Sequence, residues 1–135
     1  MEEINGEFIK IFSDSGEIPR ELLEYHFNKG ADVNTKGRYG WTALIFFVLR
    51  RDFLGVQNLI SIFRESIDLD IRDPDGDTAL IISVSTGYSH ISDLLLENGA
   101  DFDVVNNSGK KYSDFFRTEK ELQDFEMKMG MYIKG

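Results

Sequence analysis

The sequence predicts an all-α fold, a solenoid of about four stacked helix–turn–helix units, because one pattern of residues recurs along the chain. The segments GADVN at 30–34, IDLD at 67–70 and GADFD at 99–103 can be aligned with one another. Each is followed by a polar turn and a glycine, and these glycines, at 40, 76 and 109, lie 36 and 33 residues apart. A unit of this length that repeats in tandem is typical of a solenoid.

Two threonines at equivalent places mark the starts of the first helices of two units. Thr42 and Thr78 both begin the triplet Thr-Ala-Leu shortly after one of these glycines. A threonine hydroxyl can accept a hydrogen bond from the free N–H groups at the start of a helix. The apolar runs that follow, at 44–49 and 80–84, are too continuous for a surface helix. We therefore expect both helices to be sandwiched between neighbouring helices.

A second helix is expected in each unit, and a glycine ends it. The stretch at 91–96 stops before Gly99, and the stretch at 22–27 stops before Gly30. Glycine tolerates the left-handed conformation that closes many helices. The polar stretch that follows then turns the chain back to begin the next pair of helices.

Three of these segments resemble the ankyrin repeat family: residues 30–34, residues 75–80 with the sequence DGDTAL, and residues 94–101 with the sequence LLLENGAD. The resemblance covers about residues 20 to 116 directly and, with degenerate caps, the whole chain. It implies a single domain, 1–135, in which each unit is a helix–turn–helix followed by a hairpin-like loop. The expected units are 1–37, 38–73, 74–106 and 107–135.

The chain departs from the family pattern in three ways. The family usually has a proline and a histidine near the threonine, but apolar residues stand at the matching positions: Ala43, Ile45, Ala79 and Ile81. Apolar packing is therefore expected to replace the hydrogen-bond network of that histidine. Three extra residues around 50–65 predict a longer second helix or a wider turn between the helices. The last unit has lost the threonine, as terminal caps often do.

Both ends of the chain carry apolar residues at helical spacing. At the amino end, a first helix should face the second unit with Phe8, Ile11 and Phe12. Ile18-Pro19 then predicts entry into the next helix, because proline is tolerated in a first turn. At the carboxyl end, a final helix should carry a stripe of Leu122, Phe125 and Met129. The following Met131, Tyr132 and Ile133 either pack on the last unit, which we favour, or form an exposed apolar tail.

Composition and charge narrow the classes of function. The chain is 41% hydrophobic, has no cysteine and contains no apolar run of the roughly 18 residues that span a bilayer. Its amino terminus is acidic, unlike a secretory signal, so a cytoplasmic location is the default expectation. A net charge of −9 disfavours nucleic-acid binding and favours a basic protein partner. A monomer is the default oligomeric state.

We find no sequence pattern that predicts catalysis, a cofactor or a metal. His26 and His90 are expected at the surface of second helices, and neither has metal-ligand spacing. Aspartates alternate at 68, 70, 73, 75 and 77, as in a calcium loop. The helix–loop–helix calcium signature, however, needs a glutamate at the end of the loop and a glycine within it, and Thr78 follows instead. The sequence therefore predicts that the chain is not an enzyme.

The resemblance implies a partner-binding face made of the loop tips and the exposed side of the first helices. By position this face comprises Arg38, Tyr39, Trp41, Leu49, Arg50, Pro74, Asp75, Asp77, Ser85, Thr86, Asn107, Ser108 and Lys110. Tyrosine, tryptophan and arginine are enriched in binding hot spots, so the first loop is expected to anchor a partner while the aspartates of the second select a basic one. Trp41 could instead pack only on a neighbouring loop.

Two functions follow from this reading. The first is a protein–protein interaction module. The alternative is a small acidic inhibitor, such as a bacterial immunity protein that neutralises a basic toxin.

Overall fold

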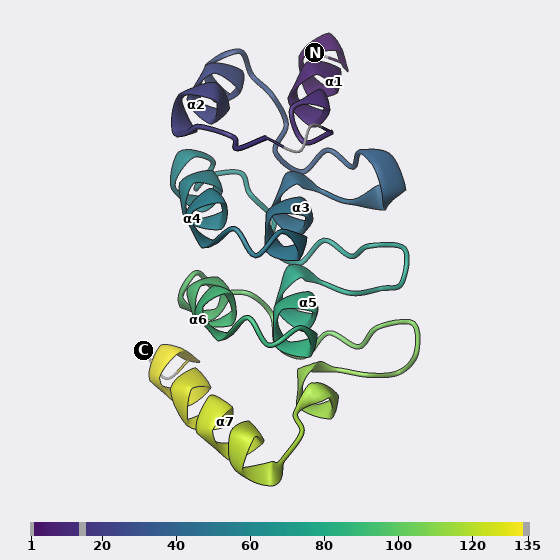
Figure 1. The fold of residues 1–135 in the computed structure, drawn as a ribbon, viewed down its shortest axis with the longest axis vertical. Coiled ribbons are helices and arrows are strands. Elements are labelled where there is room, and N and C mark those ends of the chain that lie inside the picture. Colours follow the sequence, from purple (N-terminus) through teal and green to yellow (C-terminus); the bar gives the residue numbers. More distant parts are fainter. Residues whose placement is uncertain (1, 14–15, 134–135) are drawn as a thin grey trace.

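The computed structural model describes residues 2–13 and 16–133, which form stacked pairs of helices (Figure 1). Its elements are α1 (Glu2–Lys10), α2 (Arg20–Asn28), η1 (Arg38–Gly40), α3 (Ala43–Leu49), α4 (Phe53–Ile62), α5 (Ala79–Ser85), α6 (Ser89–Glu97), η2 (Tyr112–Phe115) and α7 (Glu119–Ile133). Here α denotes an α-helix and η a 3-10 helix. These residues contain no strand, and none of their helices combines the length and apolarity needed to span a membrane. The all-α expectation is confirmed.

The helices stand in two columns, and the loops project from one of them. Figure 1 shows α1, α3 and α5 in an inner column and α2, α4 and α6 in an outer column. The connections that lead into α3, into α5 and toward η2 extend away from the inner column on the side opposite the outer helices. A stack of helical hairpins with loops on one side is the predicted solenoid.

The two threonines begin equivalent inner helices, as predicted. The Thr42 hydroxyl oxygen accepts a hydrogen bond from the Ile45 N–H at 3.3 Å, and Thr78 accepts from the Ile81 N–H at 3.2 Å. Both isoleucines are almost fully buried, at 0% and 2% exposure. Apolar packing therefore occupies the places where the family usually has a polar network. In the third unit a buried hydroxyl pair, Ser83 and Ser92 at 2.7 Å, joins α5 to α6.

The three extra residues of the second unit lie at the end of its outer helix. Helix α4 has ten residues and α6 has nine, and the turn after α4, at 63–66, is longer than the turn at 98–99. The connections between inner and outer helices, 50–52 and 86–88, are equal in length. The prediction of a longer second helix is confirmed, and the prediction of a wider turn between the helices is wrong.

Polar side chains join successive units at the base of the loops. Asn34 Oδ1 accepts a hydrogen bond from the Asp68 N–H at 2.8 Å, and Asp70 Oδ1 accepts one from the Asp101 N–H at 2.8 Å. The Asn34 amide also donates to the Ser66 carbonyl at 2.9 Å. Burial raises the pKa of Asp70, and the nearby carboxylates of Asp101 and Asp68 raise it further, although its bond with the Asp101 N–H opposes them. The hydrogen bond to the next unit is thus accepted by a neutral amide at Asn34 and by a carboxylate at Asp70 whose charged form is disfavoured.

The amino-terminal helix packs on the second unit, as predicted. The Phe8 and Phe12 side chains are buried, and Ile11 is partly buried. The ring centroid of Phe12 lies 5.3 Å from that of Phe47 in α3, and that of Phe8 lies 5.7 Å from that of Phe63. Pro19 occupies the cap position just before α2.

The carboxyl-terminal helix packs on the last repeat. In α7 the Phe125 and Met129 side chains are buried and Leu122 is partly buried, which confirms the predicted stripe. The Phe125 ring lies 5.0 Å from Phe116. The side chains of residues 131–133 lie outside the described part of the chain.

One histidine is buried, contrary to expectation. His26 is 4% exposed and packs against Phe8 and Tyr25, with ring centroids at 5.7 and 5.2 Å, while His90 is exposed as predicted. Within the described chain, its buried Nδ1 has no hydrogen-bond partner. Burial lowers the pKa of His26, and the Glu7 carboxylate opposes this effect. The sequence predicted an exposed His26 because the residues around it do not reveal that α1, a separate helix, covers this side of α2.

Candidate binding surface

Three loops project from the inner column, and the same backbone hydrogen bond closes each of them. We call residues 37–41 the first loop, 73–77 the second loop and 106–110 the third loop. In each loop the N–H of the first residue donates a hydrogen bond to the carbonyl of the last residue, at 2.9, 2.9 and 2.8 Å respectively. The fourth residue is a glycine with φ of +72°, +83° or +77°, which favours glycine. The sequence positions assumed to be equivalent are therefore equivalent in space.

The second and third loops are joined by hydrogen bonds. The Asn107 amide donates to the Pro74 carbonyl at 2.8 Å, and the Asn107 N–H donates to the Asp75 carbonyl at 3.0 Å. The Asn106 amide donates to the Asp77 carboxylate at 2.8 Å. The two loops therefore form one continuous surface, which we call the ledge.

A side-chain acceptor at the start of the second and third loops fixes their backbone. Asp73 Oδ1 accepts from the N–H groups of Asp75 and Asp77, both at 2.9 Å. Asn106 makes the same two bonds in the third loop, with Ser108 at 2.9 Å and Lys110 at 3.0 Å. Such turns are common uses of aspartate and asparagine, because their short side chains reach the backbone two residues on.

The first loop lacks this acceptor and has a different backbone conformation. Gly37 stands at the acceptor position, and a Cβ atom there would lie 2.5 Å from Ile9 Cγ2 of α1, so a larger residue would require Ile9 to move. Tyr39 adopts the left-handed conformation, with φ of +66°, whereas Asp75 and Ser108 do not. A bulky residue in this region is strained by about 1–3 kcal/mol.

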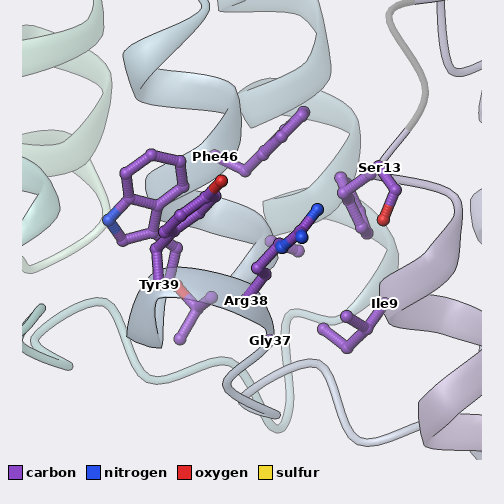
Figure 2. Close-up of a pocket in the computed structure, with 10 residues that line it drawn as sticks. Ile9, Ser13, Gly37, Arg38, Tyr39 and Phe46 are labelled. Atoms are coloured by element: carbon purple, nitrogen blue, oxygen red, sulfur yellow. The ribbon is translucent and has the colours of Figure 1, made fainter.

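A hollow of about 190 Å³ lies between α1, the first loop and α3 (Figure 2). Its lining residues are Ile9, Phe12, Ser13, Gly37, Arg38, Tyr39, Trp41, Thr42, Ala43 and Phe46. We call it the first-loop hollow. It brings together the three residues of the first loop that the sequence nominated, and it adds an apolar wall from α1 and α3.

The wall from α1 was missed at the sequence level. Ile9 lies in α1, and Phe12 and Ser13 lie in the turn at 11–13 that follows it, at i, i+3, i+4 spacing along the sequence. That spacing was the available signal, but the first helix was interpreted as a cap and not as part of a site.

Aromatic rings and a guanidinium line the mouth of the hollow. The ring centroids of Tyr39 and Trp41 lie 4.9 Å apart, and Arg38 Cζ lies 5.6 Å from the Tyr39 centroid. The Tyr39 side chain is 63% exposed. Figure 2 shows Arg38 extending between Tyr39 on one side and Ile9 and Ser13 on the other.

The other nominated residues lie outside the hollow. Leu49 and Ser85 are exposed at the ends of α3 and α5. Ser85 and Thr86 each donate a hydroxyl to the Ile82 carbonyl, at 3.0 and 2.6 Å. Arg50 donates to the Gly16 carbonyl at 3.2 Å, and its guanidinium carbon lies 5.4 Å from the centroid of Phe46, a lining residue.

The second loop concentrates negative charge at its tip. One carboxylate oxygen from each of Asp73, Asp75 and Asp77 lies within 4.8 Å of the others. Burial raises the pKa of Asp77, the bond from Asn106 lowers it, and the carboxylates of Asp73 and Asp75 raise it further. Oxygens of Asp73 and Asp77 already accept hydrogen bonds from the loops, so the cluster is accounted for by the turn itself.

Comparison with known proteins places this geometry in context. The family model described as ankyrin repeats (3 copies) matches residues 11–106. The chain is 38% identical over 87 residues to the B-cell lymphoma 3 protein homolog of Mus musculus, and 29% identical over 65 residues to a putative ankyrin repeat protein of fowlpox virus (strain NVSL). These matches cover 64% and 48% of this chain but only 19% and 15% of those relatives.

Two solved structures share the fold. The ankyrin repeat protein EF0377 superimposes with a TM-score of 0.66 and 32% identity, covering 84% of this chain and 58% of that one. The ankyrin repeat domain of Bcl-3, described as a unique member of the IkappaB protein family, superimposes with a TM-score of 0.70 and 20% identity. That match covers 78% of this chain and 46% of the other.

Proposed function

Because the chain belongs to the ankyrin-repeat family, we propose that it functions by binding another protein through the loops and inner helices. The observation that carries this proposal is the first-loop hollow, where Arg38, Tyr39 and Trp41 meet. These three residue types dominate binding energy at interfaces, because they bury a large area and keep a polar group. A binding function of this kind needs no catalytic residue.

The conformation of Tyr39 supports the proposal. Its ring is largely exposed, and its backbone is held in a conformation that disfavours tyrosine. Strain of this kind concentrates at functional sites, because stability alone would select glycine or asparagine. The ring therefore has a use that outweighs its cost, and contact with a partner is such a use.

The proposed binding surface extends from the hollow along the ledge and the ends of the inner helices. It comprises the residues nominated from the sequence together with Ile9, Ser13 and Phe46. Asp75 and Asp77 would meet basic groups of the partner. With a net charge of −9 the chain would also speed its encounter with a basic partner, and salt would slow that encounter.

The test is affinity capture from a native lysate of the source organism, comparing the wild-type chain with surface variants. Trp41→Ala should weaken capture of a specific partner by about 2 kcal/mol or more, roughly thirtyfold in dissociation constant. Tyr39→Gly removes the second ring and suits the left-handed backbone, so it tests the same surface if Trp41→Ala does not fold. Arg64→Ala on the outer side is the matched control. Capture that is equally strong with all four proteins would refute the proposal.

The narrower interpretation, an acidic inhibitor of a toxin, gains no support from the family match or from these relatives. It stays a prediction of the sequence, as does the cytoplasmic location.

A further inference from the structure

The three loops carry different charges although the same backbone hydrogen bond closes each of them. The first loop presents Arg38 beside two aromatic rings, and the second presents Asp73, Asp75 and Asp77. None of the residues lining the first-loop hollow is acidic, although the chain has 24 acidic residues against 15 basic ones. Among the described residues, Arg38 has no carboxylate within ion-pair distance. As far as the described residues go, the hollow is therefore a local basic site on an acidic protein.

The size of the hollow sets the kind of group that it can hold. Its volume is about 190 Å³, and a cavity of about 150 Å³ in a protein core accommodates benzene. Ile9, Phe12, Ala43 and Phe46 provide apolar walls. One branched aliphatic or aromatic side chain fits this volume and would bury its apolar surface there. A guanidinium at the rim would then favour a carboxylate next to that side chain.

The second loop offers the next charge along this side of the stack. Asp75 is equivalent to Tyr39, the residue after Arg38, and lies one loop further along. A group of the same extended segment that meets Asp75 would therefore lie several residues from the group that meets Arg38.

We propose, building on the function proposed above, that the first-loop hollow binds an extended segment of the partner in one polarity. An apolar side chain of the segment fills the hollow, and an acidic residue two positions from it, on the same face of the extended segment, pairs with Arg38. A basic residue several positions further along pairs with Asp75. A segment with the two charges exchanged would place like charges together at both loops, which is destabilising.

A displayed library of random ten-residue peptides, selected against the full-length chain, tests this inference. The enriched peptides should share an apolar and an acidic residue two positions apart, with a lysine or arginine several positions further along. A synthetic peptide with the winning sequence is then compared with the same peptide in which the acidic and basic residues are exchanged. Trp41 is the only tryptophan of the chain, so its fluorescence reports binding of peptides that lack tryptophan. The exchanged peptide should bind at least tenfold more weakly.

Charge reversal supplies the decisive variants. Arg38→Glu should abolish the preference between the two peptides, because each then meets one like and one opposite charge, and Arg64→Glu on the outer side should leave the preference unchanged. Circular dichroism confirms that each variant is folded. Tyr39→Gly keeps Arg38 and the left-handed turn, so it should weaken both peptides without changing their order.

Three results would overturn the inference: no enrichment, enrichment without the charge pattern, or a preference that survives Arg38→Glu. The function proposed above fails separately. If Trp41→Ala abolishes capture of the natural partner while the peptides show no polarity, the binding surface stands and the ligand chemistry is wrong.

Discussion

Exchanging Asp70 for asparagine should stabilise the protein at neutral pH. Asp70 and Asn34 occupy equivalent places and accept equivalent hydrogen bonds, each at 2.8 Å from the N–H of the next unit. Asparagine would keep the acceptor oxygen and remove a charge that burial and two neighbouring aspartates disfavour. The site is partly exposed, so solvent screens the repulsion, and we expect a gain of about 0.5 kcal/mol in unfolding free energy.

The raised pKa of Asp70 determines how the effect of Asp70→Asn on the free energy of unfolding varies with pH. The folded-state pKa of Asp70 is raised, so the folded protein binds more protons than the unfolded chain between the unfolded pKa of 3.8 and the folded one. The stabilising effect of protonation is fully present below pH 3.8 and is lost as pH rises through the folded pKa. Asp70→Asn should therefore gain most at pH 7 and least near pH 4. Urea unfolding at several pH values measures the difference.

The mirror substitution is the control. Asn34→Asp loses the amide that donates to the Ser66 carbonyl and adds a carboxylate near Asp68, so it should destabilise the protein by about 1 kcal/mol. If Asp70→Asn destabilises at pH 7, or if its effect does not change with pH, the assignment of strain to this charge is wrong.

Three further substitutions test packing of the first unit. The pKa of His26 is lowered in the folded protein, so the unfolded chain takes up the proton first as pH falls. The free energy of unfolding should therefore decrease as pH drops below about 6.5. His26→Phe should remove this decrease, measured as urea midpoints between pH 7.5 and 5. Gly37→Ala should cost about 1–3 kcal/mol in urea unfolding, because its Cβ would meet Ile9 at 2.5 Å. Gly6→Ala, in a helix with open space around it, should instead stabilise by about 0.5–1 kcal/mol, and a loss there would contradict the placement of α1.

Local chemistry made most of the fold predictable. A threonine before an apolar run and a glycine after one specify where helices begin and end, and Thr42 and Thr78 act as expected. The equivalence of the three loops also followed from the positions of their glycines.

The features that sequence analysis missed depend on contacts between distant segments. Burial of His26 requires α1 to cover α2, and no local pattern around His26 reports that contact. The left-handed Tyr39 stands in the loop that has Gly37 in place of the side-chain acceptor, and Ile9 approaches Gly37 from another helix, so no local pattern reports either feature. The first-loop hollow needs all three segments in place, so the sequence could nominate its loop residues but not its walls.

The closeness of the second and third loops makes the molecule divisible into a fixed part and an adjustable part. At Gly76 a Cβ would lie 2.5 Å from Asn107 Oδ1, so a larger residue there would clash with the third loop and increase its distance from the second. Arg38 and Tyr39 belong to the first loop, which touches the second through Gly40 and Pro74 but, among the described residues, is not hydrogen-bonded to it. Their side chains can therefore be varied to redirect the protein to a new target while the remaining surface keeps its shape, which makes residues 38 and 39 the natural starting point for engineering altered specificity.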